Sequence, residues 1–96
     1  MVITMLQAEV AAEHSSQLAE AFSQAGGALP PPIRESFLAH EAGTAMWRIM
    51  TVWESREALD SYRQSVDVPA GVLMFRSVGA EPTLSIHDVA EHASHP

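Results

Sequence analysis

AMWRIMTVWESREALDSYR, residues 45–63, is the stretch of this chain that decides the fold. Its first nine residues predict a strand, in which successive side chains point to opposite sides of the sheet. One face would carry Ala45, Trp47, Ile49, Thr51 and Trp53, and the other Met46, Arg48, Met50 and Val52. Because both faces are largely apolar, this pattern is typical of a sheet that is covered on both sides.

The second half of the same stretch predicts an amphipathic helix. Ser55 stands where the N-cap belongs, and the positive end of the helix dipole favours Glu57 in the first turn. The inner stripe of this helix would consist of Ala58, Leu59, Tyr62 and Val66. The helix should end before Pro69, and residues 70–78 predict a further short helical segment that Gly79 closes.

The remaining elements complete a known order. Residues 2–10 predict a first strand, and residues 11–25 predict a helix that Gly26 and Gly27 stop. After the extended prolines 30–32, residues 33–42 predict a second strand that turns back as a hairpin onto residues 45–53; residues 83–89 predict the last strand. The order β-α-β-β-α-β predicts an α+β, ferredoxin-like fold: an antiparallel four-stranded sheet with both helices on one face. Residues 1–96 would form one domain, with a disordered tail at residues 91–96.

Such a sheet leaves its second face bare. The apolar side chains available for that face are Met5, Met46, Met50 and Val52. They would form a patch larger than soluble monomers usually expose. A second copy that places its sheet against this one would cover the patch by an isologous contact, so we expect a homodimer through the open sheet face.

Composition excludes several classes of function. The net charge of −7, from 12 acidic residues against five arginines and no lysine, opposes binding to nucleic acid or to anionic membrane surfaces. The absence of cysteine removes thiolate nucleophiles and sulfur-ligated metals, and it suits a reducing compartment. No apolar run is long enough to span a bilayer, and the N-terminus lacks the basic start of a signal peptide. We therefore expect a cytoplasmic protein.

A metal site is not expected either. Three histidines, His87, His92 and His95, lie near the C-terminus, but their spacing fits no common metal site.

The segment VWESREALDSYR, residues 52–63, together with FRSVGAEPTL, residues 75–84, resembles the antibiotic biosynthesis monooxygenase (ABM) domain of the dimeric α+β barrel superfamily. The motif-like part consists of Trp53, Ser55, Glu57, Ala58 and Leu59. The resemblance implies a homodimer whose two sheets face each other, with a pocket in each subunit between sheet and helices. The family includes cofactor-free oxygenases that oxidise polyketide-like phenols, as well as haem-degrading relatives.

This chain departs from the family pattern in three ways. It has Thr51 where the family often has Glu, and Tyr62 where the family often has His. It also contains no asparagine, although the oxygenases and the haem degraders typically place a working Asn in the pocket. These departures make haem degradation the branch that the sequence favours least.

Trp53, Tyr62 and His40 are the candidate catalytic residues. The resemblance would put Trp53 at the pocket wall, where its indole could stack on a flat ligand and donate one hydrogen bond; alternatively, it is a core residue at the strand-to-helix corner. The Tyr62 hydroxyl could act as donor or base, or merely mark the edge of the core. The His40 imidazole could accept a phenol proton near neutral pH, or be a surface histidine.

The candidate substrate-binding residues are Trp47, Ile49, Leu59, Phe75 and Arg76. Trp47 and Ile49 share the strand face of Trp53, and a core role is the alternative for both. Arg48 and Arg76 are the two candidates for holding an enolate or carboxylate. If Arg48 instead faces a partner subunit, it needs a carboxylate such as Glu35 or Glu41 beside it.

Two functions of different classes follow. The first is a cofactor-independent monooxygenase that oxidises a small planar apolar phenol or enol, with no cofactor and no metal. The second is a non-catalytic dimeric barrel that binds a small hydrophobic ligand or serves only assembly. The absence of asparagine, and of the histidine that the family often has at the position of Tyr62, fits the second function equally well.

Overall fold

The computed structural model describes residues 1–26 and 29–95. The elements, in chain order, are β1 (Val2–Glu9), the short 3₁₀ helix η1 (Ala12–His14), α1 (Ser15–Gly26), β2 (Ile33–His40), β3 (Met46–Trp53), α2 (Arg56–Ser65), α3 (Ala70–Ser77) and β4 (Thr83–Asp88). Every predicted element is present. The largest difference is the first helix, whose predicted start at residues 11–14 is a separate 3₁₀ turn. Of the predicted features, Gly27 in the helix stop and Pro96 in the tail lie outside the described residues.

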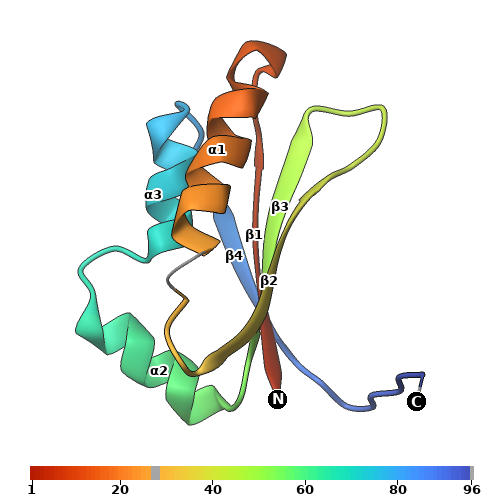
Figure 1. The fold of residues 1–96 in the computed structure, drawn as a ribbon, viewed down its shortest axis with the longest axis vertical. Coiled ribbons are helices and arrows are strands. Elements are labelled where there is room, and N and C mark those ends of the chain that lie inside the picture. The colour runs from red at the N-terminus through yellow and green to blue at the C-terminus, as the bar shows by residue number, and fades with distance from the viewer. Residues whose placement is uncertain (27–28, 96) are drawn as a thin grey trace.

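The predicted ferredoxin-like fold is confirmed. The four strands form one antiparallel sheet in the order β2-β3-β1-β4, and α1, α2 and α3 lie together on one side of it (Figure 1). The central pair aligns Val2 with Trp53, Thr4 with Thr51 and Leu6 with Ile49. This register puts the even-numbered residues of β1 and the odd-numbered residues of β3 on the helix side, as the alternation predicts.

The core lies between this sheet face and the helices. Leu18 of α1 and Phe75 of α3 are completely buried and pack with Ile49 of β3. A second buried cluster joins Val2 and Trp53 at the other end of the central strands. The helices therefore cover the sheet at two places, and the space between these two clusters is available for a site.

Two local sequence signals act as predicted around α2 and α3. The Ser55 hydroxyl accepts a hydrogen bond from the backbone N–H of Ala58 at 3.1 Å, so Ser55 is the N-cap of α2. Gly79 follows α3 with a φ of +77°, a backbone conformation that side chains with a Cβ rarely adopt. Together the cap and the glycine set where α2 begins and where the chain turns back toward β4.

No helix of the described residues lies on the second face of the sheet (Figure 1). In its middle row, the register aligns Phe37 with Met50 and Met50 with Met5, and Phe37 is 49% exposed. Arg48 on this face forms an ion pair with Glu41 at 2.9 Å, so Glu41 rather than Glu35 is its carboxylate partner. The homodimer that this face predicts stays a prediction.

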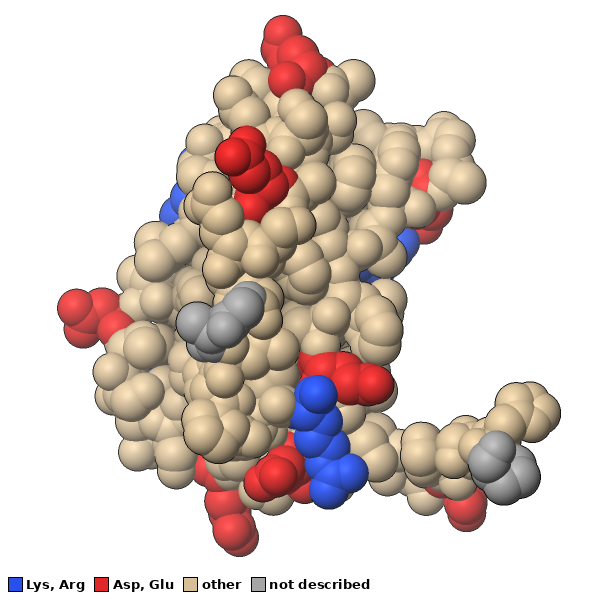
Figure 2. Space-filling model, in the orientation of Figure 1, with Lys and Arg blue, Asp and Glu red and all other residues tan. Residues whose placement is uncertain are grey.

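Among the described residues, no helix has the length and apolar character needed to cross a membrane. The cytoplasmic location expected from the composition stays a prediction. Acidic side chains are scattered over the molecular face seen in Figure 2, and basic side chains are few there. This surface agrees with the net charge of −7.

Candidate functional site

A cavity of about 550 Å³ lies between the sheet and the helices. All four strands and all three α-helices contribute to its lining, and its size falls within the range typical of small-molecule sites. Five of the predicted site residues line it: Ile49, Trp53, Leu59, Tyr62 and Arg76. The lining also includes Thr4, Leu6, Phe22, Ser36, Thr51, Arg63, Gly71, Glu81 and Leu84.

Trp53 forms part of the floor of the cavity and is only 4% exposed. Its indole Nε1–H donates a buried hydrogen bond to the Thr4 hydroxyl at 3.0 Å. Its ring lies 5.2 Å from the ring of Tyr62, at an angle of 46°. Because an indole has a single N–H, this bond leaves Trp53 without a hydrogen-bond donor for a ligand, and its low exposure makes it mainly a packing residue of the cavity wall.

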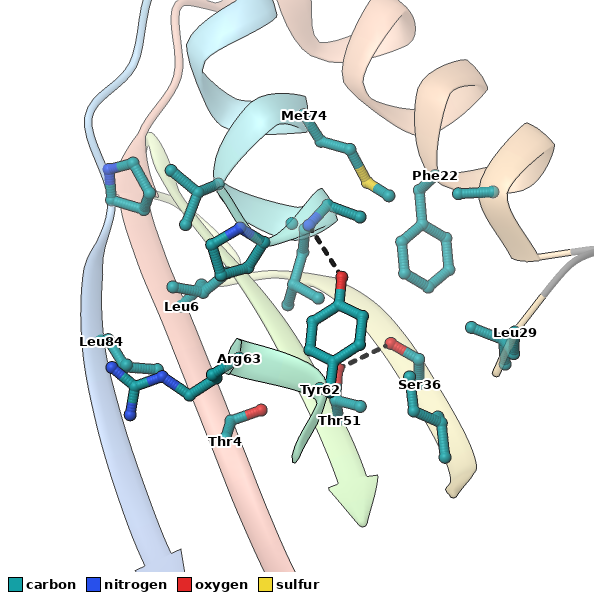
Figure 3. A pocket seen from close by; sticks show the side chains of 18 of the residues that line it. Thr4, Leu6, Phe22, Leu29, Ser36, Thr51, Tyr62, Arg63, Met74 and Leu84 are labelled. Atoms are coloured by element: carbon teal, nitrogen blue, oxygen red, sulfur yellow. Dashed lines mark hydrogen bonds between the residues drawn. The ribbon is translucent and has the colours of Figure 1, made fainter. Parts of the chain in front are cut away.

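Tyr62 reaches from α2 into the middle of the cavity, as Figure 3 shows. Its hydroxyl oxygen accepts a hydrogen bond from the backbone N–H of Ala70 at 3.1 Å. The hydroxyl proton takes no part in that bond, so it can be donated to a ligand oxygen. A hydroxyl that accepts a hydrogen bond is polarised and becomes a better donor itself. The start of α3 thus prepares Tyr62 as a donor.

A second group of hydroxyls comes from the sheet. Ser36 of β2 and Thr51 of β3 lie opposite each other in the register, and their hydroxyl oxygens are 3.0 Å apart (Figure 3). One hydroxyl donates to the other, which leaves one proton of the pair for a ligand. Sequence reasoning did not select either residue. Thr51 and Trp53 lie two residues apart on one strand and so share a face, and this alternation could have identified Thr51 as a cavity residue.

The charged residues of the lining are Arg63, Arg76 and Glu81. Arg76 donates two hydrogen bonds to Glu81, at 2.9 and 2.8 Å. These hydrogen bonds lower the pKa of the Glu81 carboxyl below its ordinary value, and they raise the pKa of Arg76. Arg76 is therefore held by a carboxylate of its own chain. Arg63, which sequence reasoning missed, is the other arginine at the cavity.

Three predicted site residues lie outside this cavity. Phe75 is completely buried in the core, where it packs between α3 and the sheet. Trp47 and His40 lie toward the β2–β3 hairpin, where they line a different hollow together with Thr44. They pair across the strands at the end of the sheet farthest from Trp53, which is why they are separated from the cavity.

His40 stacks on Trp47 with ring centroids 4.4 Å apart and is exposed. Its Nε2 lies 2.6 Å from the Thr44 carbonyl oxygen. A carbonyl oxygen only accepts, so Nε2 carries the proton and donates it in this bond. His40 and Tyr62, both proposed from sequence as catalytic, are therefore not brought together by the fold.

Within residues 1–26 and 29–95, no group of three or more His, Cys, Asp or Glu side chains is placed to hold a metal ion. None of the five histidines lines the cavity. The donor groups that face the cavity are hydroxyls and guanidinium groups.

A sequence profile described as antibiotic biosynthesis monooxygenase matches residues 1–72. The chain belongs to this family. The family match runs from β1 to the start of α3 and includes Trp53, Tyr62, Ser36 and Thr51. No curated protein matches the sequence.

Solved structures share the ABM fold along almost the whole chain. The heme-degrader MhuD from Mycobacterium tuberculosis is 20% identical, over 98% of this chain and 100% of that chain, with a TM-score of 0.74. SnoaB, a cofactor-independent oxygenase from Streptomyces nogalater, is 12% identical over 98% and 97%, with a TM-score of 0.72. Rv0793 from Mycobacterium tuberculosis is 17% identical over 97% and 98%, with a TM-score of 0.71. At these identities the likeness shows the fold alone.

Proposed function

We propose that this ABM-family protein is a cofactor-independent monooxygenase that oxidises a small planar apolar phenol or enol. The observation that carries the proposal is the cavity itself, a mostly apolar space in which the Tyr62 hydroxyl is polarised by the Ala70 N–H. The aromatic residues Trp53 and Phe22 are among those that line this space, which suits a flat aromatic ligand. The family match and the cofactor-independent oxygenase among the structural relatives support the same reading.

The chemistry needs little from the protein. An anthrone-type substrate loses a proton to form an enolate, which then reacts with O₂ at carbon. Loss of water from the resulting hydroperoxide leaves a quinone carbonyl, so one oxygen atom enters the product and the other leaves as water. The substrate supplies all the electrons, and the reaction consumes one O₂ for each quinone formed.

The residues of the cavity would act mainly by favouring the enolate. The Tyr62 hydroxyl donates to the enolate oxygen, and the free proton of the Ser36–Thr51 pair is a second donor. Donors aimed at the developing negative charge lower the pKa of the substrate, so that water or buffer can take its proton. Glu81 is committed to Arg76, so the proposal assigns no side chain as base.

The donor set fits haem less well. Histidine is the commonest protein ligand to haem iron, and no histidine lines this cavity. Tyrosine can also bind haem iron, but the hydroxyl oxygen of Tyr62 already accepts a hydrogen bond from the backbone N–H of Ala70. The residues that line the cavity therefore do not fit a haem group.

Oxygen uptake tests the proposal. The purified protein, incubated with an anthrone-type phenol, should consume O₂ and form the quinone faster than buffer alone. Tyr62→Phe removes a hydrogen bond to a charged group and should lower the rate about tenfold or more. Ser77→Ala, which removes an exposed hydroxyl bonded to the Met74 carbonyl, is the matched control and should not change the rate.

The outcome separates the two classes of function. No acceleration over a panel of such phenols would remove the enzyme proposal. Binding of the same phenols without turnover, detected by quenching of tryptophan fluorescence, would favour the non-catalytic barrel. An equal rate for wild type and Tyr62→Phe would leave an enzyme whose donor is not Tyr62.

We also propose that the protein is a homodimer in which the open sheet faces meet. The row of Phe37, Met50 and Met5 supports this, since it leaves apolar surface at the centre of a face without helices. Sedimentation at low micromolar concentration should give twice the chain mass. A stable, folded single chain under these conditions would disprove the dimer.

A further inference from the structure

Arg63 is the charged residue of the cavity that has no ion pair within the described residues. Salt bridges occupy Arg48, Arg56 and Arg76. Arg34, the fifth arginine, lies on β2 and does not line the cavity. The guanidinium of Arg63 is therefore the positive charge that this cavity can offer to a ligand.

Arg63 lies on the opposite side of the cavity from the hydroxyl pair. Figure 3 shows its side chain leaving α2 and extending toward Leu84 of β4, with Thr4 beside it. Ser36 lies on β2, at the other edge of the sheet. Three interstrand steps of about 4.8 Å separate these edges, so the cavity spans about 14 Å across the sheet. A ligand of several fused rings fits that span.

Charge makes the position of Arg63 unusual. The chain as a whole carries −7, and such a field repels anions. The charged lining residues are two arginines and one glutamate, so the cavity carries one positive charge after Arg76 and Glu81 neutralise each other. An anionic ligand should therefore bind in this cavity in preference to the remaining, mostly acidic, surface of the protein.

Resting on the function proposed above, we propose that the substrate is a fused-ring phenol or enol that carries a carboxylate at the end remote from the reacting group, and that Arg63 binds this carboxylate. A guanidinium presents two parallel N–H donors that match both oxygens of a carboxylate. Tyr62 and the Ser36–Thr51 pair then contact the other end. Arg63 determines specificity and takes no part in the oxidation.

The test uses two redox-inert ligands that differ in charge and little else, anthraquinone-2-carboxylate and 2-(hydroxymethyl)anthraquinone. Their dissociation constants are measured by tryptophan fluorescence quenching, for which Trp53 lies at the cavity. Wild type should bind the carboxylate about fivefold more tightly, the upper end of the range for an exposed ion pair. The preference should decrease at 0.5 M salt, because ions screen it.

Three variants identify the residue responsible. Arg63→Gln keeps most of the side chain and should abolish the preference, while Arg63→Lys should retain part of it. Arg34→Gln changes the net charge by the same amount outside the cavity and should keep the full preference. Because Arg63 is exposed on α2, none of these changes threatens folding.

Each outcome bears on the proposal. Equal affinity of wild type for the two ligands, equal loss in Arg63→Gln and Arg34→Gln, or no binding of either ligand would overturn it. A preference that depends on Arg63 without any oxidation of anthrones would support Arg63 as the carboxylate-binding residue for a bound ligand, and would refute the enzyme proposal. Oxidation of neutral and carboxylated anthrones with equal kcat/KM would refute it and leave the enzyme proposal intact.

Discussion

The hydrogen bond between Trp53 and Thr4 allows a sharp test of how the cavity floor is held. Thr4→Val replaces the hydroxyl by a methyl group of similar size, so the packing changes little while the acceptor disappears. The indole N–H of Trp53 would then be buried without a partner, since it lies in a residue that is only 4% exposed. The variant should therefore be less stable than the wild type.

The magnitude follows from the cost of an unsatisfied buried donor, about 1–3 kcal/mol, so we expect a loss of about 2 kcal/mol. That is a large part of the about 5–15 kcal/mol by which domains are stable. With a urea m-value of about 1.3 kcal/mol/M, the unfolding midpoint should fall by about 1.5 M. Thr83→Val, at an exposed strand position, is the control and should change stability by less than about 0.5 kcal/mol.

Urea unfolding at one fixed protein concentration measures these differences, because any self-association would make stability depend on concentration. The decisive comparison repeats Thr4→Val in a Trp53→Phe background, where the donor is already absent. There the substitution should cost less than about 0.5 kcal/mol, since no N–H is left unpaired. The same cost in both backgrounds would refute the role of this hydrogen bond.

Two further predictions concern the cavity wall and its rim. A Cβ at Gly71 would lie 2.6 Å from the Leu6 Cδ1, the far end of a flexible side chain, so Gly71→Ala should displace Leu6 into the cavity. The free energy of unfolding should stay within about 1 kcal/mol, because the alanine also favours the helix, while ligand affinity changes several-fold; unchanged affinity would contradict this. At the rim, Glu81 has a lowered pKa, so its contribution to stability is present above its unfolded pKa of about 4.3 and is lost as the pH falls through the lower folded value. NMR titration should show the Glu81 midpoint rising in Arg76→Gln, and an unmoved midpoint would disprove the coupling.

Much of the fold is determined by the sequence alone. The alternation over residues 45–53 sorts Ile49, Thr51 and Trp53 onto one face, and these three residues are buried as the pattern predicts. The Ser55 cap and Gly79 mark the start of α2 and the end of α3. These features are predictable because side-chain alternation, capping and backbone conformation depend on residues only a few positions apart.

The candidate site was predictable only in part. The family resemblance implied that Trp53 lies at the pocket wall, and the helical stripe pointed Tyr62 inward; both residues line the cavity. His40 stayed a candidate because the sequence does not show which end of the sheet borders the cavity; the structure places it beside Trp47 and away from Trp53. Ser36 went unnoticed, since its contact with Thr51 exists only through the register of β2 on β3.

Tertiary structure alone decided which polar groups remain available to a ligand. Sequence offered Arg48 and Arg76 as anion-binding residues, but the fold pairs Arg48 with Glu41 and Arg76 with Glu81. The fold leaves Arg63 of α2 at the cavity, with no ion pair among the described residues. The physical reason is that a guanidinium pairs with whichever carboxylate is brought within about 3–4 Å. Glu41 and Glu81 lie only seven and five residues from their arginines, but the turns between them and the packing decide whether the charged groups meet.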